Sequence, residues 1–220
     1  MSKIVLNEFD ANKDLSKAGI SMAKTILCKS KEEVLKAIKE VNFPVVLKIL
    51  SSDIMHKTEA GCVVVGIENN EDLLEAYDRV INNAKKYNSN ANIQGVIVQQ
   101  MLSKGLEVIF GVKKDEQFGH TVIFGMGGIY VEIYEDVALR ILPIDEDQAV
   151  EMINETKISK ILKGARGQNY NFSEVIDVLL KLSKYVENNP KVEEIDINPY
   201  ILYDDGSKGG GVDSLITMTE

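Results

Sequence analysis

Cysteine and clustered positive charge are both scarce in this chain. The two cysteines, Cys28 and Cys62, are far apart and form no CxxC pair, which argues against a disulfide framework or a zinc knuckle and fits a reducing compartment. Lysine and arginine form no cluster, and the formal net charge is −9 at pH 7. Because nucleic-acid affinity rests largely on clustered basic residues, we expect no nucleic-acid partner.

Long hydrophobic runs are also missing. No apolar run approaches the roughly 20 residues that span a bilayer, and the N-terminal segment has no apolar core of the kind found in signal peptides. We therefore expect a cytoplasmic protein without a membrane partner. The chain does have 220 residues of which 45% are hydrophobic, enough to bury a substantial core in one or two compact units.

Hydrophobic periodicity predicts alternating strands and helices in the first half of the chain. After a first helix that Asn7 could cap, the predicted elements are a strand over 22–28, a helix over 30–41, strands over 45–50 and 62–67, a helix over 69–87 and a strand over 95–100. Ser30 and Glu33 would form a capping box, and Asn70 could cap the later helix. The resulting β-α-β-β-α-β order is the split βαβ arrangement of an α+β sandwich.

The second half has a different pattern. Residues 105–133 are predicted to form antiparallel strands with a turn over 115–119. Further predicted elements are a helix that follows a cap at Asp145, a helix that begins at Ser173, and strands over 192–203 and 212–218, joined through a flexible glycine tract over 206–211. We predict two domains, over residues 1–99 and 100–220.

Lys48 and the glycines after residue 124 each have two interpretations. Lys48 interrupts an apolar strand, where an unpaired ammonium is costly, so its side chain either reaches solvent or has an anionic partner. Gly125, Gly127 and Gly128 could turn backbone N–H groups toward phosphate oxygens, or could form an ordinary glycine-rich hairpin loop.

Oxygen-bearing side chains on two predicted neighbouring strands suggest a metal site. Asp196, Asn198 and Asp213 offer the hard oxygen ligands that Mg²⁺ prefers, although acids that flank a turn on a solvent-exposed face would give the same pattern. His56 lies in the segment "SSDIMHKTEAG" and is either an exposed loop histidine or a nucleophile. A neutral imidazole is nucleophilic near neutral pH, because the reference pKa of histidine is about 6.5.

Four segments together carry a resemblance to a known family, and they cover nearly the whole chain: 19–67, 95–144, "ETKISKILKGARG" and "EIDINPY". They resemble the ATP-grasp β subunits of ADP-forming acyl-CoA synthetases, and "SSDIMHKTEAG" resembles the phosphohistidine loop of that family. The resemblance implies an ATP-grasp fold, of mixed α+β or α/β content, with a nucleotide cleft between two subdomains. It also implies an acid–thiol ligase that makes ATP from acyl-CoA, ADP and phosphate, reversibly.

The resemblance also assigns roles to residues of this chain. His56 would carry a phosphoryl group, with ATP or ADP and Mg²⁺ as cofactors. Matched by motif, the remaining residues are Lys48, Gly127 and Gly128 for the phosphates, Gln100, Met101 and Leu102 for the adenine, Glu107 for the ribose, and Asp196, Asn198 and Asp213 for magnesium. His120, in a predicted hairpin turn, is expected to be structural. No segment resembles the family's CoA-binding module, so a separate α subunit is implied, in an α2β2 assembly.

The sequence departs from the family pattern at two positions, and, separately, two rival functions remain open. Cys62 stands where a second glycine is common, and Asp196 stands where many ATP-grasp proteins have glutamate, whose reach is longer. One rival is an ATP-grasp carboxylate–amine ligase, which forms an acyl phosphate directly and needs no histidine carrier. The other is a non-catalytic ATP-grasp regulatory module, whose mark would be loss of the histidine or of the metal ligands, and this chain retains both.

Overall fold

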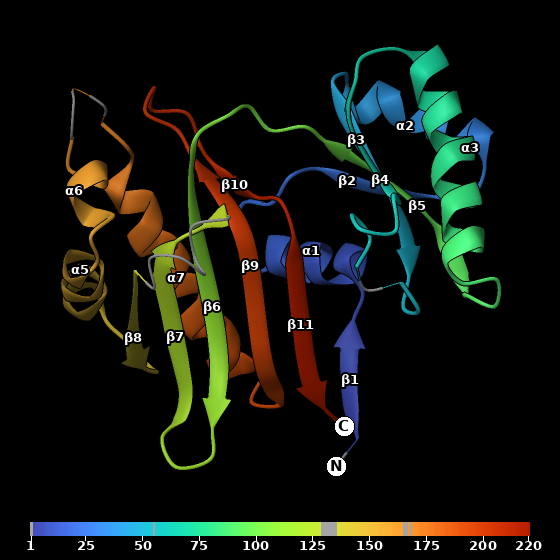
Figure 1. The fold of residues 1–220 in the computed structure, drawn as a ribbon. Helices are drawn as coiled ribbons and strands as arrows, with labels where there is room; N and C mark the ends of the chain where they lie inside the picture. Colours follow the sequence, from blue (N-terminus) through green and yellow to red (C-terminus); the bar gives the residue numbers. More distant parts are fainter. Residues whose placement is uncertain (1, 55, 129–135, 165–166, 168) are drawn as a thin grey trace. The chain divides into compact units, whose positions relative to one another are not determined.

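The computed structural model describes residues 2–54, 56–128, 136–164, 167 and 169–220, and these form two compact units (Figure 1). The larger unit comprises Met1–Leu6, Asp10–Met22 and Ser103–Glu220, and the smaller comprises Asn7–Phe9 and Ala23–Leu102. The units are therefore not two successive halves of the chain. No helix among the described residues is long and apolar enough to cross a membrane.

The smaller unit contains a four-stranded antiparallel sheet and two helices. The sheet order is β2 (Thr25–Cys28), β5 (Ile93–Gln100), β3 (Val45–Ser51), β4 (Val63–Ile67), and the helices are α2 (Lys31–Val41) and α3 (Asn70–Tyr87). In sequence this is the predicted β-α-β-β-α-β order, which is confirmed. Each β-α-β pair is split by one antiparallel strand, because β5 separates β2 from β3, and β3 separates β4 from β5.

Strand β3 is buried along its whole length. Leu47 and Ile49 pack in one hydrophobic cluster with Val34 of α2 and Leu73 of α3, so both helices cover the same face of the sheet. Side chains alternate along a strand, which directs Lys48 to the opposite face. Burial on both faces explains why this strand appears in the sequence as an almost continuous apolar run.

The helix caps of the smaller unit differ in detail from the prediction. Ser30 caps α2 by accepting the N–H of Glu33, but the carboxylate of Glu33 accepts the N–H of Lys29 at 2.7 Å, so the predicted reciprocal box is wrong. Asn69 caps α3 by accepting the N–H of Asp72, so the predicted cap at Asn70 is wrong by one residue. Both positions carry asparagine, and only the backbone geometry distinguishes them.

The larger unit contains a seven-stranded sheet within the described part of the chain. Its order is β1 (Lys3–Leu6), β11 (Ser214–Thr219), β9 (Val192–Leu202), β6 (Leu106–Asp115), β7 (Gly119–Met126), β8 (Val137–Ile141), and β10 (Gly210–Gly211) pairs with β9. The predicted antiparallel hairpin with a turn at 115–119 is confirmed, since Asp115 pairs with Gly119 across it. The part of that prediction at 129–133 lies outside the described residues.

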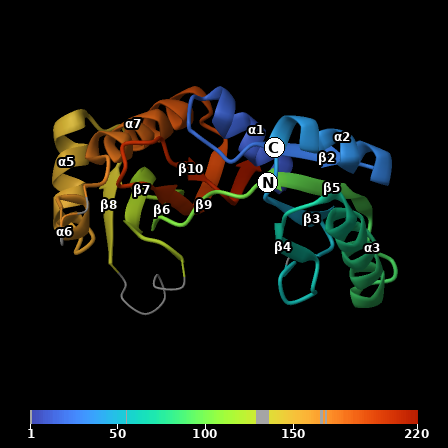
Figure 2. The same ribbon diagram turned by 90° about the horizontal axis from the view of Figure 1, so that it is seen from above.

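Helices α5 (Glu146–Glu155), α6 (Ser159–Leu162) and α7 (Phe172–Asn188) belong to the larger unit, and α5 and α7 cover one face of its sheet (Figure 2). Asp145 caps α5 as predicted and forms a capping box with Gln148. Asn171 caps α7, which begins at Phe172, so the predicted start at Ser173 is one residue late.

The hydrophobic core of the larger unit includes Phe110, whose ring lies 5.3 Å from each of its two aromatic neighbours, Phe124 and Tyr200.

The second half of the glycine tract is not a flexible link, contrary to the prediction. Gly209, Gly210 and Gly211 are buried, and the N–H of Gly209 donates to Oε1 of Glu174 at 2.9 Å. A Cβ added at Gly209 would lie 2.0 Å from the carbonyl oxygen of Ile201. Glycine is needed at this position because the backbone approaches its neighbour closely.

Candidate functional site

His56 is exposed on the loop that joins β3 to β4, residues 52–62, which we call the His56 loop. Two of its side chains, Ile54 and Cys62, are completely buried and anchor it on either side of the histidine. The N–H of Cys62 donates to the carbonyl of Lys57 at 2.8 Å, and the N–H of Ala60 donates to the carbonyl of His56 at 3.0 Å. The loop therefore presents an exposed imidazole from a turn fixed on the protein core.

The end of the His56 loop is held by α3. Asn83 donates its side-chain N–H to the carbonyl of Gly61 at 2.7 Å, and Gly61 has a φ of +63°. A Cβ added at Gly61 would lie 2.9 Å from Nδ2 of Asn83. The turn thus takes its left-handed residue at Gly61, while Cys62 packs into the core and does not need that conformation.

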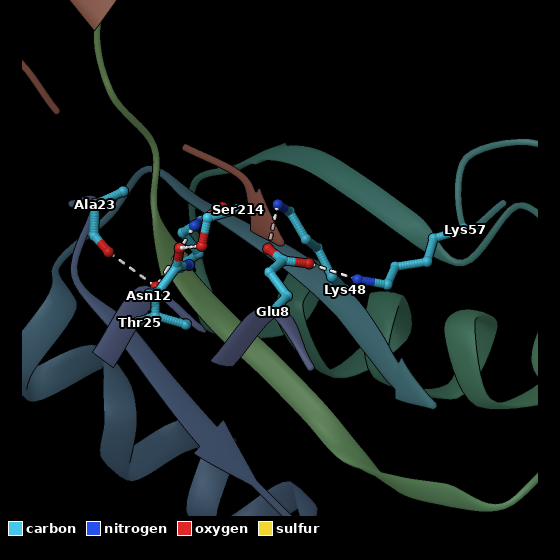
Figure 3. A network of polar contacts seen from close by, with 8 residues as sticks. Glu8, Asn12, Ala23, Thr25, Lys48, Lys57 and Ser214 are labelled. Atoms are coloured by element: carbon cyan, nitrogen blue, oxygen red, sulfur yellow. Dashed lines mark hydrogen bonds and ion pairs between the residues drawn. The ribbon is translucent and has the colours of Figure 1, made fainter. Parts of the chain in front are cut away.

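Lys48 has an anionic partner, which settles the two alternatives left by the sequence. Its Nζ lies 2.6 Å from Oε1 of Glu8, the first residue of α1 (Glu8–Lys17), and both side chains are buried. The other carboxylate oxygen of Glu8 accepts from Nζ of Lys57 at 2.5 Å (Figure 3). Burial raises the pKa of Glu8, but the two ammonium groups outweigh it and hold the pKa below its ordinary value.

The residues predicted to meet an adenine lie at the end of the smaller unit's sheet. The N–H of Gln100 donates to the carbonyl of Lys24 at 2.8 Å, and the N–H of Met101 donates to the carbonyl of Pro44 at 3.2 Å. These two backbone donors therefore stabilise the end of β5.

Four predicted site residues of the larger unit converge. The N–H of Gly127 donates to the carbonyl of Glu107 at 2.9 Å, and the N–H of Gly128 donates to Oδ1 of Asn198 at 3.2 Å. Gly128 has a φ of +64°, and a Cβ added there would lie 1.9 Å from Oε2 of Glu107. Pairing of β6 with β7 and β9 brings together residues that are more than 90 positions apart in the sequence.

The predicted metal ligands are neighbours, with Asp196 and Asn198 on β9 and Asp213 directly before β11. The N–H of Asn198 donates to the backbone carbonyl of Asp213 at 3.2 Å, and residues 196 and 198 share a face of β9 because side chains alternate. Burial, together with the carboxylates of Glu194 and Asp213, raises the pKa of Asp196 to about 6. A partly buried carboxylate surrounded by other acids is an environment that a cation stabilises.

Among the described residues, no group of three or more histidine, cysteine, aspartate or glutamate side chains is arranged to hold a metal ion by itself. Mg²⁺ needs fewer protein ligands, because it usually takes one or two carboxylates and keeps waters and substrate phosphates. Two carboxylates, Asp196 and Asp213, beside the amide oxygen of Asn198 fit that ligand set.

The predicted site residues thus fall into two groups, one in each unit. The smaller unit holds Lys48, His56, Gln100, Met101 and Leu102, and the larger holds Glu107, Gly127, Gly128, Asp196, Asn198 and Asp213. The other histidine, His120, contacts the carbonyl of Val192 through Nε2 at 2.6 Å, a contact within the larger sheet. Glu8 was not predicted as a site residue, because its two partners are 40 and 49 residues away and no local pattern marks them.

Comparison with known proteins identifies the class of this fold. Residues 2–217 match the model of the ATP-grasp domain family. The chain is 40% identical over 213 residues to the β subunit of acetate–CoA ligase (ADP-forming) II from Pyrococcus furiosus, covering 96% of this chain and 90% of the relative. It belongs to the family of β subunits of ADP-forming acetate–CoA ligases, which are ATP-grasp proteins. The predicted fold and family are confirmed.

Two solved structures are similar over 98% of this chain and 93% of theirs. Both are of the dinucleotide-forming acetyl-coenzyme A synthetase 1 from Ca. Korarchaeum cryptofilum. One, with a TM-score of 0.89 and 36% identity, holds coenzyme A, acetyl-coenzyme A and a phosphorylated phosphohistidine segment in the site I orientation. The other, with a TM-score of 0.86 and 34% identity, holds coenzyme A and Mg-AMPPCP, with the phosphohistidine segment pointing towards the nucleotide binding site.

Proposed function

We propose that this chain is the nucleotide-binding, phosphoryl-transferring β subunit of an ADP-forming acyl-CoA synthetase, with acetyl-CoA as the type substrate. The observation that carries the proposal is the exposed imidazole of His56 on a loop anchored by buried side chains, in a chain related to such β subunits over nearly its whole length. In the direction of ATP synthesis, acyl-CoA, ADP and phosphate give the carboxylic acid, CoA and ATP.

His56 acts as the phosphoryl carrier of this reaction. An unprotonated ring nitrogen attacks the phosphorus of a phosphohistidine on the partner subunit, so one P–N bond forms while the other breaks. A terminal phosphate oxygen of ADP then attacks the same phosphorus, the P–N bond to His56 breaks, and the new P–O bond completes ATP. Every step is reversible, so ATP can also phosphorylate His56.

In-line transfer needs the reacting atoms to lie about 3 to 3.5 Å apart. A mobile carrier meets this requirement in turn at two separate sites, one on the partner subunit and one at the nucleotide. The two orientations of the phosphohistidine segment described for the Korarchaeum relative support the same movement for the His56 loop. Lys48 would neutralise phosphate charge, Glu107 would bind the ribose, and residues 100–102 would bind the adenine. Gly127 and Gly128 would let the backbone come close to the phosphates, and in this structure their N–H groups donate to the carbonyl of Glu107 and to Oδ1 of Asn198.

Magnesium is the metal that this site would hold, on Asp196, Asn198 and Asp213. When bound, it supplies positive charge to the phosphates during transfer. These three side chains would supply oxygen ligands to the ion. Asp196 is partly buried beside two other acids, and a bound divalent cation would stabilise this group of carboxylates. Asparagine at position 198 adds a ligand without adding negative charge.

The partner would be a CoA-binding α subunit, in an α2β2 heterotetramer located in the cytoplasm. The β-subunit names of the Pyrococcus relatives support a partner subunit. Chemistry at the acyl carbon would take place on that partner, since no segment of this chain resembles the CoA-binding module.

The test is to mix this chain with a family α subunit, labelled ATP and Mg²⁺, and to map acid-labile phosphate by peptide. Label on His56 supports the proposal, and His120→Ala serves as the control because it removes the other histidine without touching the carrier. Formation of acyl phosphate without any phosphorylated histidine on this chain would instead indicate a carboxylate–amine type of ligase. Absence of both products would favour a non-catalytic module.

A further inference from the structure

The carboxylate of Glu8 joins two lysines that belong to different parts of the phosphoryl-transfer machinery. One oxygen binds Lys48, the proposed phosphate ligand on β3, and the other binds Lys57, which directly follows the proposed carrier His56. The side chain of Glu8 is 3% exposed, that of Lys48 is 7% exposed and that of Lys57 is 20% exposed. This is a largely desolvated ion triad, and Figure 3 shows Glu8 lying between the two ammonium groups.

The triad differs from a surface ion pair because its charged groups are largely buried. Exposed pairs contribute little, because water and salt screen them and the long side chains lose entropy. Buried charges are costly unless each is paired with good geometry. Both carboxylate oxygens of Glu8 are paired with ammonium groups, and this pairing fixes the position of each lysine side chain.

We propose that Glu8 is a positioning residue for phosphoryl transfer, which holds the His56 loop through Lys57 in one of its two orientations while it orients the ammonium of Lys48. The inference rests on the proposed function, because it concerns the placement of the carrier histidine. Lys57 and His56 are adjacent in the chain, so holding the ammonium of one restricts the backbone of the other. Glu8 itself touches neither phosphate nor imidazole in this role.

A positioning role predicts a particular kinetic pattern. Phosphoryl transfer depends steeply on alignment, and a misplacement of about 1 Å can cost up to about a hundredfold in rate. Nucleotide affinity depends on many contacts that Lys57 does not make. Loss of the Glu8–Lys57 contact should therefore lower kcat by about tenfold or more and leave the KM for ADP nearly unchanged.

The test uses the complex reconstituted with an α subunit and compares Lys57→Met, Glu8→Gln and the double variant. Lys57→Met is the milder disruption, because it leaves the buried Glu8–Lys48 pair intact. The matched control is Asp78→Asn, which removes an ion pair of 2.6 Å to Lys31 on the surface of the same unit. We expect kcat to fall in both single variants, the double variant to be no worse than Glu8→Gln, and the control to match the wild type.

Hydrogen exchange supplies a readout that does not depend on activity. The amides of Ala60 and Cys62 bond within the His56 loop, so Lys57→Met should speed their exchange while the core of β3 stays protected. Unchanged kcat and unchanged loop exchange in Lys57→Met would overturn the inference. If the wild-type complex never carries phosphate on His56, the proposed function fails instead, whatever Glu8 does to the loop.

Discussion

The N–H of Gly128 donates to the side chain of Asn198 across 70 residues of sequence. This bond connects the segment that follows β7 to the middle of β9, and so connects a proposed phosphate-binding glycine to a proposed magnesium ligand. The same glycine lies against the carboxylate of Glu107, the proposed ribose ligand. A side chain at position 128 would collide with the carboxylate of Glu107.

Gly128→Ala should weaken nucleotide binding. The left-handed φ and the short approach to Glu107 should together cost about 1 to 3 kcal/mol, partly in stability and partly in affinity for ADP. Gly119→Ala is the matched control, since Gly119 has a φ of +76° and nothing within 4 Å of an added Cβ. Calorimetric titration with ADP should separate them, and equal affinity in the two variants would remove Gly128 from the phosphate site.

Asp213→Ala should weaken nucleotide binding in the presence of Mg²⁺ more than in its absence. Loss of an oxygen ligand lowers metal affinity by about tenfold or more, whereas metal-free binding does not use that carboxylate. Titrations with and without Mg²⁺ measure the difference, with Asp205→Ala, in an exposed turn, as the control. Equal losses under the two conditions would mean that Asp213 is not a magnesium ligand.

His56→Ala should abolish ATP formation in the reconstituted complex. Magnesium–nucleotide affinity should stay near that of the wild type, and so should phosphorylation of the α subunit by acyl-CoA and phosphate, because neither uses this imidazole. Lys57→Ala should be milder, since it removes a positioning contact and not the nucleophile. ATP synthesis at a near-normal rate by the His56→Ala complex would show that phosphate reaches ADP directly.

The isolated chain should bind nucleotide but should make no acyl-CoA until an α subunit is added. The physical reason is that its predicted site residues concern nucleotide, metal and phosphate, and none of its segments resembles a CoA-binding module. A coupled assay for acyl-CoA with each subunit alone and with both together tests this division of work. Steady acyl-CoA formation by this chain alone would contradict it.

Acid should remove the stabilising effect of Glu8. The pKa of this carboxyl is held below its ordinary value of 4.5, so the folded state gains stability from it above that pH and loses the gain as the pH falls through the folded pKa. At pH 7, Glu8→Gln should lower the free energy of unfolding by about 3 kcal/mol, because it breaks a buried ion triad. Denaturant unfolding should show this difference shrinking below pH 4.5, and a difference that grows there would refute the assignment.

The sequence predicted the elements well where a pattern is local. Strand β3 is recognisable because burial on both faces leaves a continuous apolar run, and the order of elements in the smaller unit follows from such runs. The cap of α3 was predicted one residue late, at Asn70, because adjacent asparagines are equally good caps until the backbone is known. The start of α7 was also predicted one residue late, at Ser173 where the helix begins at Phe172. Strand β1 was not predicted, since its side chains are mostly exposed and its pairing partner is at the other end of the chain.

The candidate site shows the same difference between local patterns and long-range contacts. The sequence indicated that Lys48, a charged residue in an apolar strand, needs solvent or an anionic partner, but it could not identify Glu8 as that partner. The tract before Asp213 appeared flexible because glycine permits many conformations, yet it is glycine there that allows β10 to lie against β9. Composition describes what a segment is able to do, and contacts across the sheet select among those possibilities.

Pairing of β1 with β11 has a consequence for the order of folding. Lys3 pairs with Thr219, and Leu6 pairs with Ile216, so this part of the larger sheet joins segments separated by more than 200 residues. The sheet of the smaller unit is built from residues 25 to 100 and has far shorter sequence separations to close. Closure of long loops slows folding. During synthesis, the sheet of the smaller unit, which carries the His56 loop, can therefore form before β11 of the larger unit has been made.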